Sequence, residues 1–234
     1  MVRNFRSFIS SSLLHKQPIE DGLLSLHVTD CLSHPRFRAA YDAGKKTGSW
    51  NDAELRWRVY TCCWAAEHAL SVDGDFIECG VNRGGMARAV TEYVGFSSLP
   101  RTFYLFDTFC GDSDVAEVNQ HDYRECYEDV QKTFASFPNV RLIRGRIPGT
   151  LPEVKPKAVA FLSIDLNNAL PEVAALRYFW HLLSVGAVVI LDDYAYSPDY
   201  KTQKDAIDNL AAELRFSVFT LPTGQGMIIK GGHS

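Results

Sequence analysis

The chain has 234 residues and a formal net charge of −4 at pH 7, from 24 Lys and Arg residues against 28 Asp and Glu residues. This length suits one α/β domain, with or without an appendage, and it is enough to bury a large core. The acidic balance offers no basic surface, so no nucleic-acid partner is expected. The chain begins MVRNFRSFISSSLL, whose apolar part is too short and too interrupted for a signal peptide or a membrane span.

The six cysteines are scattered along the chain, and none forms a C-x-x-C pair, so a zinc site is not expected. Several of them lie in apolar stretches, where a free thiol behaves as a small hydrophobic group. Reduced thiols are typical of the cytoplasm, which is the location that the sequence predicts.

Residues 1–50 show no sustained pattern, because proline and glycine interrupt it, and they predict short helices and loops. We expect this segment to form a lid or an oligomer contact; the alternative is a terminus that is disordered or merely packed. Residues 51–234 are expected to form the main domain. That domain begins with a helix over residues 51–70, capped by Asn51 at its amino end.

Residues 75–85, DFIECGVNRGG, predict a buried strand, a tight turn and the start of a helix. Glycines let the chain turn sharply and let a ligand approach the backbone, and free amides at a helix start can hold a polar or anionic group. The spacing is not G-x-G-x-x-G, which argues against a nicotinamide-dependent oxidoreductase. The alternative is a strand-to-helix turn whose glycines serve only packing.

Further strands alternate with helices after this turn. Strands are predicted at residues 102–107, 139–144, 158–165 and 187–193, helices at residues 123–137, from Asn168 and from Pro198, and a hairpin at residues 216–230. This alternation predicts an α/β fold with a doubly wound, mainly parallel seven-stranded sheet that ends in a C-terminal antiparallel hairpin.

Acidic residues end three of these strands. Asp107 could accept hydrogen bonds from both ribose hydroxyls of a nucleoside cofactor, or it could simply cap a loop. Asp165, Asp192 and Asp193 end two later strands, and three adjacent carboxylates repel one another unless something neutralises them. A divalent cation that prefers oxygen ligands, such as Mg²⁺, would do so and could hold a substrate hydroxyl. The alternative is that all three are ordinary turn and capping acids.

The motifs IECGVNRGG, LFDTFCG, SID and VILDDY, in this order over roughly residues 75–230, resemble the macrocin O-methyltransferase family. These are class I methyltransferases that depend on S-adenosylmethionine (SAM) and methylate sugar hydroxyls of antibiotics. The resemblance implies a Rossmann-like fold, SAM as donor, a saccharide hydroxyl as acceptor, and Mg²⁺ or a similar cation held by Asp165, Asp192 and Asp193. A non-catalytic SAM-binding protein and a methyltransferase for catechols are the alternatives. A homo-oligomer is also expected.

The candidate donor-site residues come from the first two motifs: Glu78, Gly80, Asn82, Gly84, Gly85, Asp107, Thr108 and Phe109. The catalytic candidates are Asp165 and His121. The family reads D-G-D where this chain reads Asp165-Leu166-Asn167, and Asn cannot take a proton at neutral pH. The base is therefore expected elsewhere, or metal coordination makes it unnecessary. His121 lies in a predicted lid over residues 108–121 and could enter the site, although an ordinary surface histidine is the alternative.

Overall fold

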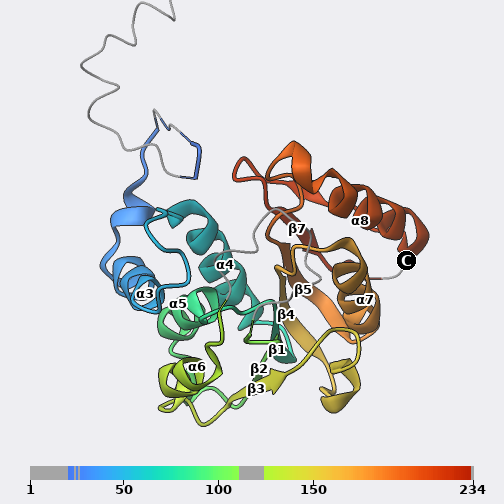
Figure 1. The fold of residues 1–234 in the computed structure, drawn as a ribbon. Coiled ribbons are helices and arrows are strands. Elements are labelled where there is room, and N and C mark those ends of the chain that lie inside the picture. The colour runs from blue at the N-terminus through green and yellow to red at the C-terminus, as the bar shows by residue number, and fades with distance from the viewer. Residues whose placement is uncertain (1–20, 24, 26, 111–123, 233–234) are drawn as a thin grey trace, which may run out of the picture.

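A mainly parallel sheet runs through the middle of the protein, with helices on both of its faces (Figure 1). The structure is a computed structural model, and it describes residues 21–23, 25, 27–110 and 124–232. The predicted α/β class is confirmed. No helix in these ranges is long and apolar enough to cross a membrane.

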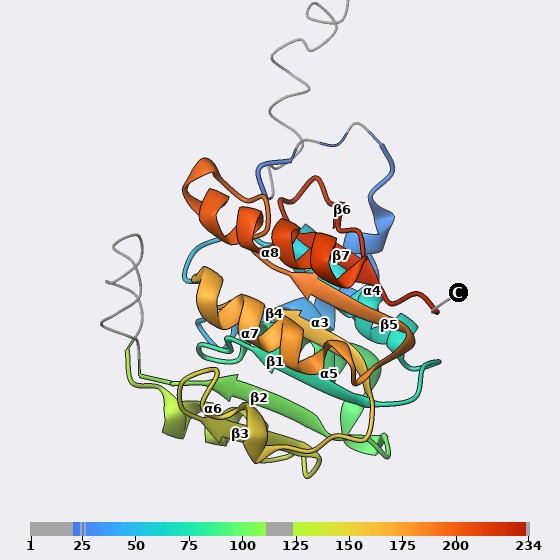
Figure 2. The same ribbon diagram turned by 90° about the vertical axis from the view of Figure 1, so that its right-hand side faces the viewer.

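Within the described residues, seven strands form one sheet in the order β3-β2-β1-β4-β5-β7-β6 (Figure 2). They are β1 Asp75–Cys79, β2 Phe103–Asp107, β3 Val140–Arg144, β4 Val159–Ile164, β5 Leu183–Leu191, β6 Phe219–Thr220 and β7 Gly226–Ile229. The pairs among β1 to β5 are parallel, whereas β7 is antiparallel to both β5 and β6, as the predicted terminal hairpin requires. The strand order reverses between β1 and β4, and such a reversal opens a crevice at the carboxyl ends of the strands.

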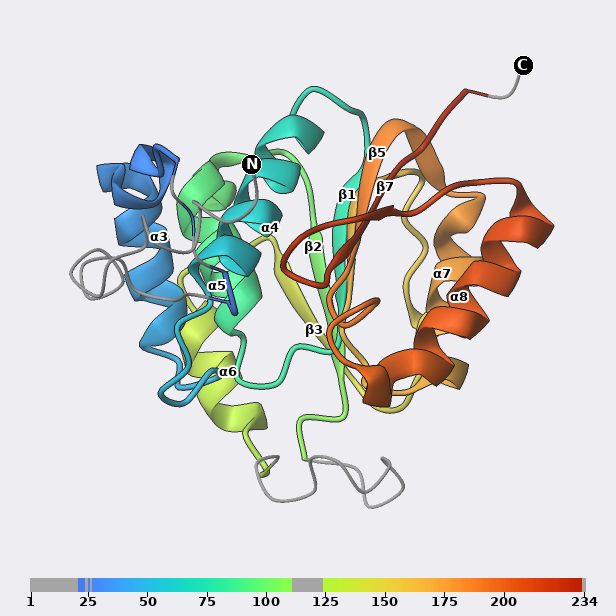
Figure 3. The same ribbon diagram turned by 90° about the horizontal axis from the view of Figure 1, so that it is seen from above.

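Two layers of helices enclose the sheet (Figure 3). One layer holds α3 Pro35–Lys45, α4 Arg56–Ala69, α5 Gly85–Val94 and α6 Tyr127–Phe134, and the other holds α7 Ala169–Trp180 and α8 Lys201–Leu214. Among the residues that the structure describes, four short 3-10 helices occur, at Asp30–Ser33, Phe96–Ser98, Leu151–Glu153 and Pro198–Tyr200. Aromatic rings fill much of the core between layer and sheet: Phe76 lies 5.2 Å from Phe96 and 5.3 Å from Phe161, measured between ring centroids.

Helix α4 begins later than the sequence predicts. Asn51 has a φ of 48° and lies in a turn, so it does not cap the helix. Asp21 takes that role from outside the predicted helix, because its Oδ2 accepts hydrogen bonds from the amides of Trp57 at 2.6 Å and Arg58 at 3.3 Å. Burial raises the pKa of Asp21 to about 6. This cap holds the first turn of α4, and with it Arg58, in a fixed place.

The starts of β5 and α7 can be compared with the starts that the sequence predicts. Strand β5 was predicted to start after Gly186, but it starts at Leu183 and runs through Gly186, whose amide donates to the Lys230 carbonyl at 2.8 Å. The break at Gly186 is therefore wrong, because ladder hydrogen bonds carry the strand across it. At α7 the prediction is confirmed: the Asn168 side chain accepts from the Leu170 amide at 3.1 Å.

Helix α3 packs into the main body of the protein. Its buried Phe37, Ala40 and Tyr41 form an apolar cluster with Val59 of α4 and Ala89 of α5. Short helices were predicted here and are present. The division into segments 1–50 and 51–234, and the role of the first as lid or contact, stay predictions.

Candidate functional site

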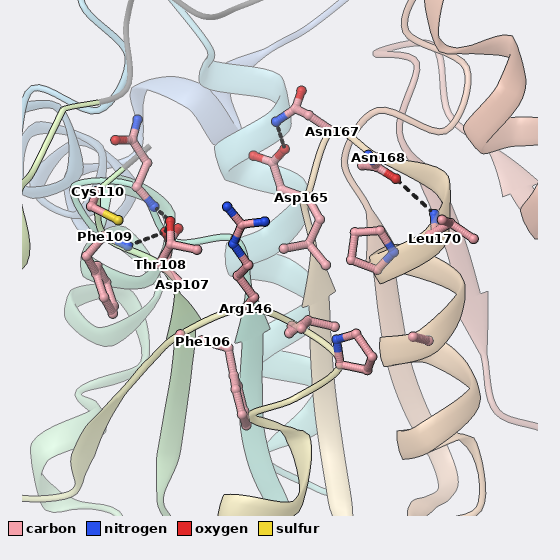
Figure 4. A pocket seen from close by; sticks show the side chains of 18 of the residues that line it. Phe106, Asp107, Thr108, Phe109, Cys110, Arg146, Asp165, Asn167, Asn168 and Leu170 are labelled. Atoms are coloured by element: carbon pink, nitrogen blue, oxygen red, sulfur yellow. Dashed lines mark hydrogen bonds between the residues drawn. The ribbon is translucent and has the colours of Figure 1, made fainter. Parts of the chain in front are cut away.

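A cavity of about 600 Å³ opens at the carboxyl edge of β1, β2 and β4 (Figure 4). The turn after β1, the segment after β2, the loop after β3 and the start of α7 all contribute to its walls. The crevice predicted by the reversal of strand order is therefore present. Of the candidate donor-site residues, five line it: Gly80, Asn82, Asp107, Thr108 and Phe109.

The glycines of the turn after β1 lie close to other parts of the protein. Gly80 has a φ of 92°, and a Cβ there would lie 1.7 Å from the Asp165 carbonyl oxygen, at the end of β4. A Cβ on Gly85 would lie 2.7 Å from the Ser49 side chain. Both glycines thus serve close packing, which was the alternative interpretation of the motif.

The backbone amides of this turn are already used within the chain. The amides of Val81 and Asn82 donate to Asp107 Oδ2 at 2.6 and 2.7 Å, and the Gly85 amide donates to Ser49 Oγ at 2.8 Å. The expectation that these amides are free to hold a ligand group is therefore not met at these three positions.

Asp107 joins the turns after β1 and β2. Besides the two amides on Oδ2, its Oδ1 accepts from the Phe109 amide at 2.7 Å. The carboxylate therefore does cap a loop. A carboxylate has about four acceptor positions, and three are taken, so one on Oδ1 remains, where the Thr108 hydroxyl lies 3.4 Å away. The ribose role stays a prediction.

Glu78 lies behind the cavity wall. It is 2% exposed, and its carboxylate accepts a hydrogen bond from the Ala87 amide at the start of α5. Its Oε2 has no partner among the described residues, and burial raises the pKa of the carboxyl well above its ordinary value. Glu78 does not line the cavity, and neither do Gly84 and Gly85. Glu78 instead binds the start of α5, and the two glycines belong to the turn itself.

The three aspartates of the predicted metal site do meet at one edge of the sheet. The ends of β4 and β5 lie side by side, since the Asp192 amide donates to the Ile164 carbonyl at 2.9 Å. Only Asp165 lines the cavity. Burial, then Asp192 and Asp193, raise the pKa of Asp165 well above its ordinary value.

A buried arginine lies against this acidic edge. The guanidinium of Arg58, which is 4% exposed, donates to Asp192 Oδ2 and, at 3.4 Å, to Asp193 Oδ1. The other oxygen of Asp192 accepts from Gln225 Nε2 at 2.8 Å. Sequence reasoning missed Arg58, because it precedes Asp192 by 134 positions and belongs to no motif.

These contacts do not fit a metal ion in the arrangement that the structure shows. Both oxygens of Asp192 point to protein donors, and Arg58 brings positive charge to the place where a cation would have to lie. In the part of the chain that the structure describes, no group of three or more His, Cys, Asp or Glu residues is arranged to hold a metal. Magnesium coordination by Asp165, Asp192 and Asp193 thus stays a prediction that this geometry does not support.

Asn167, where the family usually has Asp, is bound to its neighbours. Its Nδ2 donates to Asp165 Oδ1 at 3.4 Å, and its Oδ1 accepts from the Tyr200 hydroxyl at 3.2 Å. Asn167 therefore helps to orient Asp165. His121, the other catalytic candidate, lies outside the described residues.

One cavity residue had no indication in the sequence. Arg146, in the loop after β3, points into the cavity between Asp107 and Asp165 (Figure 4). It follows a strand whose end carries no recognisable motif, so only the closing of the loop over the cavity reveals it.

The model of the macrocin O-methyltransferase (TylF) family matches residues 56–212, more than half of the chain. The chain belongs to this family. The matched range begins at α4 and includes the glycine turn, Asp107 and all three aspartates of the acidic edge.

Similar proteins agree with this family. Demethyldecarbamoylnovobiocin O-methyltransferase of Streptomyces niveus is 28% identical over 160 residues, which are 61% of this chain. The match spans 60% of that relative's length. The O-methyltransferase NovP has a TM-score of 0.67 at 22% identity, over 81% of this chain and 88% of its own. The calicheamicin methyltransferase CalS11 has a TM-score of 0.60 at 17% identity, over 90% of this chain and 100% of its own. These two structures share the fold.

Proposed function

We propose that this protein is an enzyme that moves the methyl group of SAM to a hydroxyl of a small molecule, and that the acceptor is a sugar or a sugar-containing natural product. The observation that supports this most is the cavity of about 600 Å³ at the carboxyl edge of β1, β2 and β4. Its size is in the range of small-molecule sites, and membership of the macrocin O-methyltransferase family supports the donor. The novobiocin-related relative supports the acceptor class.

The donor is assigned to the side of the cavity formed by the turns after β1 and β2. Asp107 is held there by three backbone amides, which fix its carboxylate before any ligand arrives. Its remaining acceptor position, on Oδ1, suits a ribose hydroxyl of SAM, and a pre-oriented carboxylate loses little entropy on binding it.

The acceptor is assigned to the side formed by the end of β4. In the transfer, the acceptor oxygen attacks the sulfonium methyl group, the O–C bond forms as the C–S bond breaks, and the hydroxyl loses its proton. Asp165 is the group that we assign to take this proton, because it is the acid at the end of β4 that lines the cavity. Asn167 orients it, and His121 stays a second candidate. The reaction as assigned has no metal-dependent step.

Calorimetric titration with S-adenosylhomocysteine (SAH) tests the donor site, and methyl transfer to a panel of nucleotide sugars, glycosides and catechols tests the acceptor. Asp165→Asn is expected to bind SAH as the wild type does and to transfer methyl groups at least 100-fold more slowly, the usual loss when a general base is removed. Absence of SAH binding by the wild type would contradict the donor assignment.

The same experiments separate the alternatives. SAH binding with no turnover on any acceptor would favour the non-catalytic SAM-binding protein, and turnover on catechols alone would change the acceptor class. The homo-oligomer and the cytoplasmic location also stay predictions. Sedimentation of the purified full chain would test the first, and fractionation of cells that express it would test the second.

A further inference from the structure

The acidic edge of the sheet contains its own cation. Arg58 comes from the first turn of α4, and 5% of its side chain is exposed, against 13% for Asp192 and 10% for Asp193. An arginine buried to this degree keeps its charge, so it compensates nearby carboxylates at any physiological pH.

The position of Arg58 is built from several directions. Asp21 binds the amides of Trp57 and Arg58 and so fixes the backbone. The ring of Tyr196 lies 4.2 Å from the centre of the guanidinium, and the Thr223 carbonyl accepts from Nη2 at 3.5 Å. The backbone of Arg58, the face of its guanidinium and its Nη2 atom are therefore all in contact with other residues, and these contacts fix the side chain in one position.

We propose that Arg58 is the resident cation of the Asp192–Asp193 pair and takes the place of a divalent metal ion at this edge of the sheet. Each oxygen of Asp192 then already accepts from a protein donor, one from Arg58 and the other from Gln225. Arg58 acts as a positioning residue: it neutralises the pair and leaves Asp165 as the one acid of the edge that faces the cavity. The protein therefore binds its donor without added Mg²⁺.

The test measures metal binding directly, on the full chain after treatment with a chelator, so it does not depend on the proposed methyl transfer. Mn²⁺, used as a spectroscopic substitute for Mg²⁺, is titrated by electron paramagnetic resonance, and Mg²⁺ by calorimetry. The wild type is expected to bind neither ion with a Kd below about 1 mM, and its SAH affinity is expected to change less than twofold when Mg²⁺ is added. Loss of SAH binding altogether would instead count against the donor site.

Arg58→Met keeps much of the side-chain length and removes the charge. It leaves Asp192 and Asp193 uncompensated, so the variant is expected to bind Mn²⁺ at least tenfold more tightly than the wild type and to gain thermal stability when Mn²⁺ is added. Arg36→Met is the matched control: it breaks an exposed pair with Glu67, at 2.5 Å, that has no acidic cluster beside it, and no gain in Mn²⁺ binding is expected.

Two outcomes would overturn the proposal. One is stoichiometric Mn²⁺ binding by the wild type that disappears in Asp192→Asn. The other is a folded Arg58→Met variant that binds Mn²⁺ no better than the wild type. If Arg58→Met does not fold, the wild-type titration and its Asp192→Asn comparison decide the matter alone, and Arg58→Lys shows whether a positive charge at this position restores folding.

Discussion

The Asp107 carboxylate accepts a hydrogen bond from the Asn82 amide across 2.7 Å, and this contact joins the turn after β1 to the end of β2. Strands β1 and β2 are neighbours in the sheet, so the contact continues their ladder beyond the last paired residues. The Asp107 side chain therefore fixes the positions of the two turns that form one wall of the cavity.

Replacing that side chain should loosen the wall. In Asp107→Asn an NH₂ group must face either the amides of Val81 and Asn82 or the amide of Phe109, so at least one buried donor loses its acceptor. We expect a loss of about 1–3 kcal/mol in the free energy of unfolding and at least a tenfold loss in SAH affinity. Chemical denaturation and calorimetry measure the two effects.

Asp75→Asn is the control for this change. Asp75 also accepts from a backbone amide, that of Thr102 just before β2, at 2.8 Å, but it does so at the amino end of β1, away from the cavity. It should lower stability and leave SAH affinity unchanged. Equal losses of affinity in the two variants would mean that Asp107 acts only through overall stability.

Gly80→Ala should be far more harmful than its backbone conformation alone explains. The new Cβ would lie 1.7 Å from the Asp165 carbonyl oxygen, whereas Gly95, with a φ of 63°, has nothing within 4 Å of the same position. Gly95→Ala should cost about 1–2 kcal/mol, which is the left-handed backbone penalty. Gly80→Ala should cost clearly more or prevent folding. Thermal unfolding compares them, and similar losses would show that the contact with β4 can relax.

Phe37→Ala tests whether helix α3 belongs to the main folding unit. Phe37 is 1% exposed and packs with residues of α4 and α5, so its loss should cost about 3–5 kcal/mol. Phe219→Ala, at a position that is 66% exposed, should cost little. A two-state denaturation curve for the wild type and a shifted single transition for Phe37→Ala are expected. A separate early transition would instead support an independent N-terminal segment.

Glu172 on α7 should make stability depend on pH. It is 6% exposed, and burial raises its pKa from 4.5 to about 8. Between these values the folded protein keeps the proton that the unfolded chain has lost. Stability is therefore fully present below about pH 4.5, and as pH rises towards 8 it falls by up to about 1.4 kcal/mol per pH unit.

Glu172→Gln should reduce this slope, because glutamine resembles the protonated acid and does not titrate, while Asp21 and Asp165, whose pKa values are also raised, keep their contributions. Denaturation of the wild type and the variant at several values between pH 5 and pH 9 measures it. Glu213→Gln, which removes an exposed carboxylate of α8 paired with Arg177, should leave the slope in place. Equal slopes in the wild type and in Glu172→Gln would contradict the assignment to Glu172.

The strands could be predicted because local pattern determines them. Apolar runs that end in acids gave β2, β4 and β5 and placed Asp107, Asp165 and Asp192 at one edge. Asn168 was found as a helix cap for the same reason: its partner, the Leu170 amide, is two residues away.

What the sequence could not provide were contacts between distant segments. Asp21 caps a helix that starts 35 residues later, and nothing in either stretch indicates the other. Repulsion among three aspartates predicts a compensating positive charge nearby. The sequence alone does not distinguish a charged protein side chain from a metal ion as the source of that charge. Only the path of α4 reveals Arg58. Likewise, the glycines were assigned to a ligand because their packing partners, Asp165 and Ser49, lie far away in sequence.

The carbonyl oxygen of Asp165 fills the space that a side chain on residue 80 would need. The turn after β1, which holds Gly80, and the proposed base Asp165 are thus in contact through the backbone. A change in either position is therefore expected to move the other. In a double-mutant cycle between the two loops, the effects should not add. If the glycine turn were transferred into a related protein, the end of β4 would have to be transferred together with it.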